Sequence, residues 1–365
     1  MSTAADNFSA SYAEARSRLH EAARSAGLAV ESIAHPLAGA QGEPLALDIV
    51  RDGPADAKRV LFLSSACHGV EGFCGSGVQL AALRDAAWRE RARSRGVAVV
   101  VLHALNPHGF SHLRRVTQEN VDLNRNFQEF SQPLPRNEGY ARIHGLLLPA
   151  QWPPTEAAQA ELMAFVAQHG MRAFQAAMSG GQHEFPDGLF YGGNAPTWSN
   201  QAVREALRRH GRRAEQAAWI DFHTGLGPQG VGERIYSGPD EPNELARARA
   251  WWDGGGRTPV TSFHDGSSTS APLTGLMYGA AAQECPQAEW TGLALEYGTE
   301  PWDVVAHALR ADHWLHLHSE APAAQAQAIH RQMRDAFYTY TDTWKAQVLA
   351  QAFDAMDQAV TGLSA

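Results

Sequence analysis

RVLFLSSACHGVEG, residues 59–72, is a short apolar run that breaks into a glycine-containing turn. Such a run is typical of a strand buried in the centre of a sheet. A helical pattern follows from about residue 77 to 93, and then a second buried strand, VAVVVL, at residues 97–102. Strand, helix and strand at this spacing form a βαβ unit. The chain is therefore predicted to be an α/β protein with a mostly parallel, doubly wound sheet.

The rest of the chain extends this sheet on both sides. An Ala- and Glu-rich helix is expected over residues 5–26, followed by strands near 28–33 and 45–50, and later strands at 217–222 and 292–295. Between them, residues 131–200 are rich in Pro and in Gly pairs and carry one amphipathic helical pattern, near 156–178. We interpret this segment as an insertion in the sheet and not as a separate domain.

The C-terminal region, residues 321–365, is expected to be a long helical extension packed on the rest. Its apolar side chains recur at steps of three and four residues, at Ile329, Met333, Phe337, Tyr340, Trp344 and Val348. This stripe is typical of a face that packs on the core. A homo-oligomer formed through the same helices would give an identical pattern.

Composition excludes several classes of function. The 30 basic and 39 acidic residues give a formal charge of −9, which argues against a general nucleic-acid binder. No run approaches the ~18 apolar residues of a membrane span. The chain has three cysteines, too few for a disulfide framework, and its N-terminus lacks the pattern of a secretory signal. We therefore expect a cytoplasmic protein that binds neither nucleic acid nor membrane.

Polar side chains with catalytic potential follow three of the expected strands. His68 and Glu71 come after the first, His223 ends the strand at 217–222, and Glu296 ends the strand at 292–295. Ligands of open α/β sheets bind outside the carboxyl ends of the strands, so these groups can share one edge. They are separated by up to 228 positions in the sequence.

Two histidines and one glutamate are a ligand set for zinc that leaves a fourth position open, as in hydrolytic sites. A separate carboxylate must then move protons, and Glu296 is the natural candidate. Simpler explanations exist for each residue. The turn containing His68 and Glu71 could be exposed or cap the next helix, and Glu296 could form a buried ion pair with an arginine.

The most specific segment is RRVTQENVDLNRNF, residues 114–127. Arg125 offers a planar fork for a carboxylate, Asn124 adds an amide donor, and Arg115 or Arg114 can approach a polarised carbonyl oxygen. A surface loop with salt bridges is the alternative explanation. A later stretch, residues 181–193, is rich in groups able to bind a ligand, and we expect it, with Tyr191, to help wall the substrate pocket.

Together these motifs resemble the zinc carboxypeptidase superfamily of the carboxypeptidase A type, and in detail an uncharacterised bacterial branch of it. The resemblance runs from about residue 59 to 300. The residues that carry it are His68, Glu71, the turn at 106–109, the block VDLNRNF at 121–127, His223 and Glu296.

The resemblance implies a three-layer α/β/α fold with a mixed eight-stranded sheet, a catalytic domain over residues 1–320 and a helical extension over 321–365. It implies that one Zn²⁺ is held by His68, Glu71 and His223 and that Glu296 is the general base and acid. Asn124 and Arg125 would bind a terminal carboxylate, and Arg115, or Arg114, would stabilise the oxyanion. The mobile tyrosine of such enzymes could correspond to Tyr278 or Tyr236.

We therefore expect a zinc-dependent hydrolase that cleaves an amide next to a free carboxylate, a metallocarboxypeptidase of short peptides. A deacylase of N-acyl amino acids, similar to succinylglutamate desuccinylase or aspartoacylase, would use the same site. A non-catalytic metal- or peptide-binding module is the third hypothesis. Cobalt or manganese could occupy the same ligands as zinc.

Overall fold

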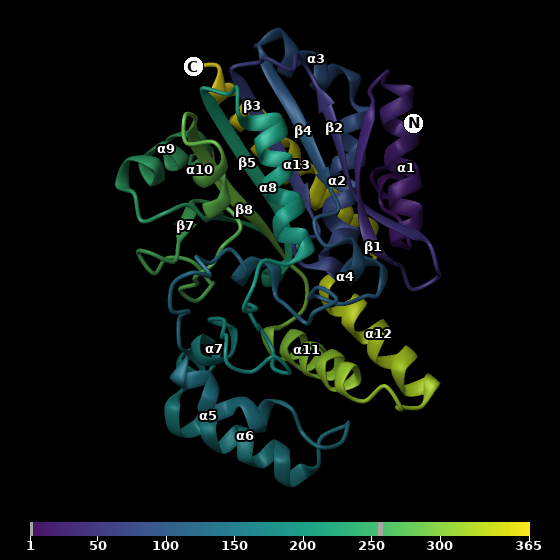
Figure 1. Cartoon of the computed structure of the whole chain (residues 1–365), viewed down its shortest axis with the longest axis vertical. Coiled ribbons are helices and arrows are strands. Elements are labelled where there is room, and N and C mark those ends of the chain that lie inside the picture. The colour runs from purple at the N-terminus through teal and green to yellow at the C-terminus, as the bar shows by residue number, and fades with distance from the viewer. Residues whose placement is uncertain (1–2, 255–257) are drawn as a thin grey trace.

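The computed structural model describes residues 3–254 and 258–365. Eight strands form one mixed sheet in the order β1-β2-β4-β3-β5-β8-β6-β7 (Figure 1). Their bounds are β1 (Val30–Ala38), β2 (Pro44–Asp52), β3 (Arg59–Ser65), β4 (Val97–His103), β5 (Gln216–Gln229), β6 (Gly232–Tyr236), β7 (Val260–Ser262) and β8 (Glu289–Gly298). Four of the seven strand pairs in the described residues are parallel, including the central pairs β4·β3, β3·β5 and β5·β8. The predicted mixed, mostly parallel eight-stranded sheet is confirmed.

Helices cover both faces of this sheet. Their bounds are α1 (Tyr12–Ser25), α2 (Gly72–Arg84), α3 (Ala86–Ser94), α4 (Pro107–Ser111), α5 (Glu138–Leu147), α6 (Glu156–His169), α7 (Met171–Ser179), α8 (Trp198–Gly211), α9 (Pro242–Trp252), α10 (Gly279–Glu284), α11 (Trp302–Leu317), α12 (Ala323–Phe337) and α13 (Asp342–Leu363). Short 3-10 turns lie at Ala4–Asn7, Gly69–Glu71 and Leu123–Arg125.

The three layers follow from alternation along the central strands. On β3, Leu61 and Leu63 point into a core shared with α1, α2 and α13, whereas Val60 and Phe62 point into a second core shared with α8 and α10. Successive side chains of a strand face opposite sides of the sheet, so a strand that is apolar at every position must be covered twice. In Figure 1 α8 lies in front of the sheet and α13 passes behind it.

Several expected helices are divided in the structure, each at an identifiable residue. The helix expected at 77–93 begins earlier, at Gly72, and ends at Arg84, because the Asp85 side chain accepts a hydrogen bond from the Trp88 amide and starts α3. The helix expected at 156–178 is broken at Gly170, which has φ +85°, a conformation that glycine adopts without strain. The N-terminal helix starts only at Tyr12, after the cap Ser11.

The prediction of one long C-terminal helix is wrong. Residues 338–341 separate α12 from α13, and Thr341 caps the second helix. The apolar stripe nevertheless packs within the chain: Ile329, Met333, Phe337, Trp344 and Val348 are all buried. Tyr340 lies in the break and is exposed. Cys67, Cys74 and Cys285 are buried free thiols. Within residues 3–254 and 258–365, no helix combines the length and apolar character needed to cross a bilayer.

Candidate active site

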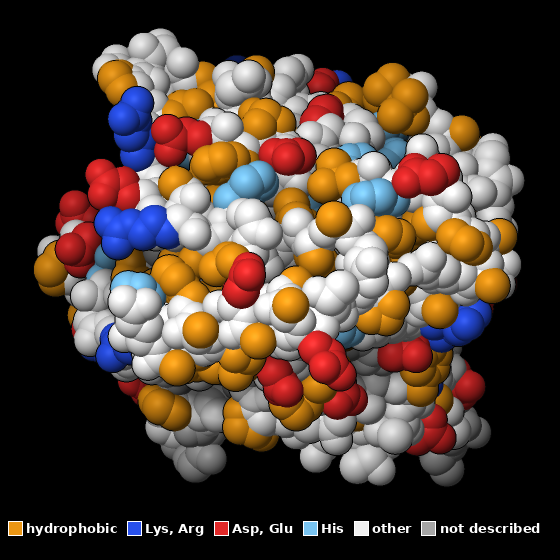
Figure 2. Space-filling model, turned by 90° about the horizontal axis from the view of Figure 1, so that it is seen from below, with side chains coloured by type: hydrophobic (Ala, Val, Ile, Leu, Met, Phe, Trp, Pro, Cys, Tyr) orange, Lys and Arg blue, Asp and Glu red, His pale blue; other side chains and the backbone are white. Residues whose placement is uncertain are grey.

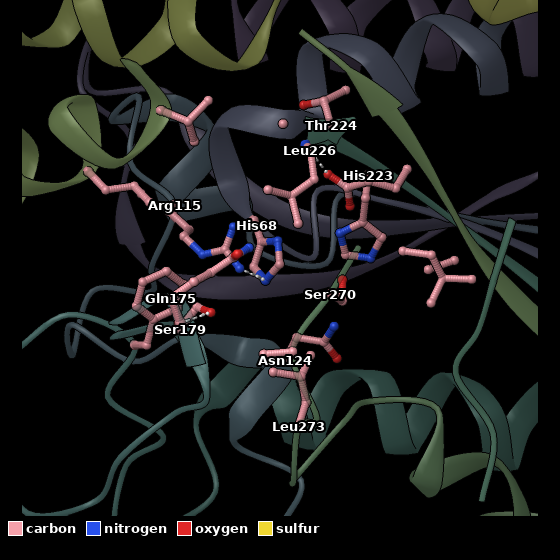
Figure 3. Close-up of a pocket in the computed structure, with 18 of the residues that line it drawn as sticks. His68, Arg115, Asn124, Gln175, Ser179, His223, Thr224, Leu226, Ser270 and Leu273 are labelled. Carbon is pink, nitrogen blue, oxygen red and sulfur yellow. Dashed lines mark hydrogen bonds between the residues drawn. The ribbon is translucent and has the colours of Figure 1, made fainter. Parts of the chain in front are cut away.

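The central strands bring the predicted site together at one edge of the sheet. β3, β5 and β8 are parallel neighbours, and His223 and Glu296 are directly paired in register. They line a pocket of about 890 Å³, including its open mouth, together with His68, Arg115, Asn124 and Arg125 (Figure 3). Residues that are distant in sequence therefore face one cavity, as expected for the carboxyl ends of parallel strands.

The turn after β3 is held against the arginine segment by its main chain. The amides of Gly69 and Val70 donate to the carbonyls of Arg115 (3.0 Å) and Arg114 (2.9 Å). Gly69 allows this approach, because a Cβ there would lie 2.1 Å from the carbonyl carbon of Gly109. These contacts place His68, Glu71 and Arg115 beside one another.

His68, Glu71 and His223 form a compact ligand set. Nδ1 of His68 lies 2.9 Å from Oε1 of Glu71, and Nδ1 of His223 lies 3.0 Å from Oε2. All three ligand atoms lie within 4.8 Å of one another, and all three residues are buried. Ligands at 2.0–2.1 Å in a tetrahedron are roughly 3.3 Å apart, so the set fits a zinc ion after small adjustments.

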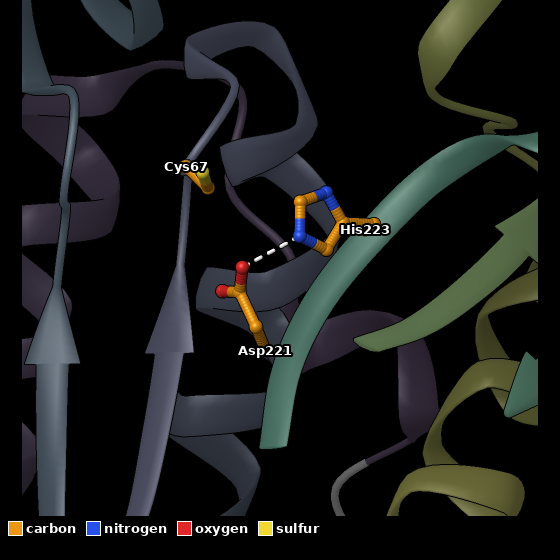
Figure 4. A group of neighbouring side chains, drawn as sticks. All are labelled: Cys67, Asp221 and His223. Carbon is orange, nitrogen blue, oxygen red and sulfur yellow. Dashed lines mark hydrogen bonds and ion pairs between the residues drawn. The ribbon is translucent and has the colours of Figure 1, made fainter. Parts of the chain in front are cut away.

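The other ring nitrogens are held by carboxylates. Nε2 of His68 lies 3.2 Å from Asp122, and Nε2 of His223 lies 2.5 Å from Asp221 (Figure 4). Histidines that bind metals usually donate their second N–H to a carboxylate, which leaves Nδ1 free for the metal, and His223 has this arrangement. At His68 the guanidinium of Arg115, which can only donate, also lies 2.8 Å from Nε2. Both histidines are thus oriented with Nδ1 toward Glu71.

A second set of ligand-type side chains, Cys67, Asp221 and His223, overlaps the first. Here Asp221 is already the hydrogen-bond partner of His223. Burial, followed by the charge of Asp221, raises the pKa of the Cys67 thiol well above its usual value, and only the thiolate is a good ligand. The set containing Glu71 is therefore the better metal site.

The charges of the site also suit a divalent cation. Four carboxylates, those of Glu71, Asp122, Asp221 and Glu296, surround the two imidazoles, and two guanidinium groups, Arg115 and Arg125, lie among them. With neutral imidazoles and all four carboxylates ionised, this group carries a net charge of −2, which is costly to bury unless it is compensated. Although burial opposes protonation of His223, Asp221 and Glu71 raise its pKa well above the usual value. A dipositive ion would supply the same compensation.

Glu296 faces the metal set without belonging to it. Its Oε1 accepts a hydrogen bond from the amide of Leu226 at 2.9 Å. Burial, and then the negative charge of Glu71, raise the pKa of Glu296 to about 7. A carboxylate with this pKa can both accept and return a proton near neutral pH.

The two adjacent arginines have different surroundings. Arg115 contacts Asp122 (3.0 Å), Glu71 (3.1 Å) and Nε2 of His68 (2.8 Å), and it lines the pocket. Arg114 points the other way, where it forms a buried ion pair with Asp312 of α11 at 3.0 Å. The structure therefore brings Arg115, and not Arg114, to the site.

Asn124 and Arg125 are presented to the pocket by the turn at Leu123–Arg125. Oδ1 of Asn124 accepts from the amide of Met277 at 2.9 Å, so its NH₂ group remains as a donor. Arg125 donates to the carbonyl of Ser179 at 2.7 Å, and its buried Nε has no hydrogen-bond partner among the described residues. Both side chains thus offer N–H groups suited to a carboxylate.

The predicted tyrosines lie elsewhere. Tyr191 is buried beside the site, and its main-chain carbonyl accepts a hydrogen bond from the main-chain amide of Asp122. The neighbouring Phe190, and not Tyr191, lines the pocket. Tyr278 donates to Glu244 at 3.0 Å and Tyr236 donates to the carbonyl of Pro239 at 2.8 Å, and both are buried. The structure places neither hydroxyl in the pocket.

Asp221 provides the first test of the site. We expect Asp221→Asn to weaken zinc binding by about 10- to 100-fold, because Nε2 of His223 loses its charged acceptor. Competition with a chromophoric chelator measures this change. Asp357→Asn removes an exposed carboxylate paired with Arg91 and is the control. Equal zinc affinities of the two variants would show that Asp221 does not support the metal site.

Comparisons with solved structures agree with the fold. Bovine thrombin-activatable fibrinolysis inhibitor, in its complex with tick carboxypeptidase inhibitor, is similar with a TM-score of 0.52, at 11% identity over 98% of this chain and 97% of that chain. A metallo-carboxypeptidase from Burkholderia cenocepacia gives a TM-score of 0.47 at 11% identity, over 96% of this chain and 69% of that chain. The predicted carboxypeptidase-like fold is confirmed.

The sequence comparisons give a family without an assigned activity. No curated protein sequence matches this chain. The family model that matches is described as "Protein of unknown function (DUF2817)", and the match extends over residues 8–351. The chain therefore belongs to the DUF2817 family.

Proposed function

We propose that this protein is a zinc-dependent hydrolase that cleaves an amide bond next to a free carboxylate. Short peptides and N-acyl amino acids are the two substrate classes with this chemistry. The proposal rests on one observation: a metal ligand set, a carboxylate with a raised pKa and an Asn–Arg pair share one pocket.

Each side chain then has a defined role. When bound by His68, Glu71 and His223, zinc supplies Lewis acidity that polarises a carbonyl and makes water nucleophilic at neutral pH. Glu296 accepts a proton from the attacking water and delivers it to the leaving amine. Arg115 donates N–H groups to the oxygen on which negative charge develops. Asn124 and Arg125 hold the carboxylate of the leaving amino acid.

The pocket beyond the Asn–Arg pair suits an apolar leaving residue. Figure 3 shows Leu273 beside Asn124, on the side away from Leu226. The surrounding wall is largely apolar, with Ile235, Phe263, Leu273, Leu276 and Ala294, and among the described residues it carries two hydroxyls, Ser237 and Ser270, but no charged side chain beyond those of the proposed site. A charged side chain in this space would lose its hydration without gaining a partner, so we propose that the enzyme prefers apolar amino acids at the cleaved end.

Arg125→Ala tests the carboxylate site. We expect KM to rise by about 10- to 100-fold with a smaller change in kcat, because a charge-assisted hydrogen bond to the substrate is lost. Steady-state kinetics on a free-acid substrate measure both constants. The control is Arg247→Ala, which removes an arginine paired with Glu289 far from the pocket. An unchanged KM in Arg125→Ala would contradict the assignment.

Arg115→Ala tests oxyanion stabilisation. We expect kcat to fall by about 10²- to 10³-fold, equivalent to about 2.7–4 kcal/mol, with little change in KM. Because Arg115 also contacts Glu71, zinc content must be measured in the same preparation. Arg114→Ala is the matched variant and should reduce stability through the loss of the Asp312 pair while kcat per folded enzyme is retained. A fall in kcat in Arg114→Ala, with kcat retained in Arg115→Ala, would assign oxyanion stabilisation to Arg114.

A substrate panel tests the activity itself. Zinc-loaded protein is incubated with free-acid peptides, the same peptides as C-terminal amides, and N-acyl amino acids, and the products are identified by mass spectrometry. Hydrolysis of free acids with the amides untouched is the expected result. Cleavage of amides and free acids at equal rates would contradict the carboxylate requirement, and no hydrolysis by zinc-bound protein would contradict the proposed function.

A further inference from the structure

A second cavity lies beside the candidate active-site pocket, between helices α6 and α7 on one side and α11 on the other. It occupies about 1990 Å³, including its open mouth, and we call it the acyl groove. It is walled by α6, α7 and α11, and in Figure 1 these helices lie together at the lower end of the molecule. The groove and the active-site pocket share the lining residues Gln175, Met178, Leu226, Trp302 and Ala306. The two cavities are therefore adjacent, and these five residues form the boundary between them.

The walls of this groove are unusually apolar for a surface. Three of the seven methionines of the chain line it, Met163, Met171 and Met178. The described part of the chain has seven large hydrophobic side chains that are exposed, and Met163, Met171 and Val304 of this groove are three of them. Figure 2 shows this end of the molecule, with apolar side chains reaching the surface among the charged ones. Clustered exposed apolar side chains mark a binding surface more often than scattered ones.

The groove starts on the acyl side of the scissile bond. Figure 3 shows Asn124 and Leu273 on one side of the two histidines and Leu226 on the other. Asn124 belongs to the pair proposed to hold the carboxylate, whereas Leu226 lines the acyl groove. A substrate with its carboxylate at Asn124 and its carbonyl at the histidines can extend its acyl group toward Leu226, while Gln175, which also lines the groove, lies beside Ser179 in Figure 3.

An aliphatic chain fits these walls better than an extended peptide. A peptide carries an N–H and a C=O at every residue, and each needs a partner when it is buried. Most of the groove is formed by helices, whose backbone groups are already bonded internally, and strand β5 contributes Leu226 and Gly227 to its lining, a short stretch for a peptide to join. Methionines, which are flexible and polarisable, adapt to a chain without fixed shape.

We propose that the acyl groove binds the aliphatic chain of N-acyl amino acids, so that the preferred substrates are amides of an amino acid with a long-chain fatty acid. The inference rests on the proposed hydrolytic function and names its substrate class. Water adds across the amide, giving a free fatty acid and a free amino acid.

The test is a series of N-acyl derivatives of one apolar amino acid, with acyl chains from two to sixteen carbons, each below its micelle concentration. We expect kcat/KM to rise roughly two- to fourfold for each added methylene until the groove is filled, because each buried methylene adds to binding. Met163→Asp should abolish this dependence and leave hydrolysis of the acetyl derivative unchanged. Leu317→Asp is the matched control, because Leu317 is exposed at the end of α11 and lies outside the groove. This variant should keep the dependence of kcat/KM on chain length.

A binding measurement separates failure of this inference from failure of the proposed function. A fluorescent long-chain fatty acid is titrated into the zinc-loaded wild type and both variants. We expect saturable binding to the wild type and Leu317→Asp, and weakened binding to Met163→Asp. Hydrolysis of peptides or acetyl derivatives without a chain-length dependence, or equal fatty-acid binding by all three proteins, would overturn the acyl groove. Saturable, Met163-dependent binding without hydrolysis of any substrate would support the groove and overturn the proposed function.

Discussion

Glu296→Gln is expected to reduce kcat by about 10²- to 10⁴-fold while zinc content and unfolding temperature stay close to those of the wild type. The amide cannot accept a proton from water, which removes the general base. It can still accept the hydrogen bond that Leu226 donates to Oε1, so the local structure should be preserved. Single-turnover kinetics with metal analysis of the same sample measure this effect.

The matched control for this change is Glu289→Gln. Glu289 lies at the start of the same strand, where it forms an exposed ion pair with Arg247. Its replacement should leave kcat within a factor of two or so, as for most exposed ion pairs. A Glu296→Gln variant with near-wild-type turnover would mean that Glu296 is not the general base and that its carboxylate has only a structural role.

His223→Ala is expected to abolish tight zinc binding and activity together. His223 supplies one of three proposed ligands, and its partner Glu71 would lose a contact at 3.0 Å. A ligand that binds only the folded state stabilises it by about 2.7 kcal/mol at a concentration 100-fold above Kd. The wild type should therefore gain stability on addition of zinc, and His223→Ala should not.

His103→Ala is the control for the loss of a buried imidazole. His103 is fully buried at the end of β4 and stacks on Tyr12, away from the metal set. This variant should be destabilised by the cavity that it creates, yet it should bind zinc as the wild type does. Zinc-dependent stabilisation of His223→Ala equal to that of the wild type would contradict the proposed ligand set.

The sheet and the main site could be predicted because their signals are local. The apolar runs at 59–66 and 97–102 identify central strands, and polar residues directly after such strands must lie at the ligand-binding edge. His68 follows β3, whereas β5 and β8 continue past His223 and Glu296, so these two side chains lie within their strands, where the apolar runs end. The Asn–Arg pair was found from its unusual sequence block.

Asp221 and Asp122, the carboxylates beside the two histidines, were not predicted from the sequence. Asp221 stands inside an apolar strand, two residues before His223, and positions two apart on a strand share a face. Asp122 lies within the block already selected, but it was given no role. The rule that a metal-binding histidine needs a second acceptor could have identified both.

Helix boundaries and the insertion were harder to predict for a different reason. Gly170 and Thr341 interrupt patterns whose apolar spacing continues across the break, so periodicity alone joins the helices. The place of α6 and α7 beside α11 depends on tertiary contacts between segments more than 100 residues apart. No local pattern encodes such a contact, and the acyl groove could not be seen before the fold was known.

The metal centre is the foundation of the proposed chemistry, and X-ray absorption spectroscopy of the zinc-loaded protein tests it most directly. Ligation by His68, Glu71 and His223 predicts a first shell of nitrogen and oxygen at 2.0–2.1 Å, with imidazole scattering from two rings and no sulfur. The spectrum should lose one imidazole in His223→Ala or His68→Ala and remain unchanged in Cys67→Ser. A sulfur shell near 2.3 Å that disappears in Cys67→Ser would place the metal on the Cys67, Asp221 and His223 set, and would contradict the proposed site.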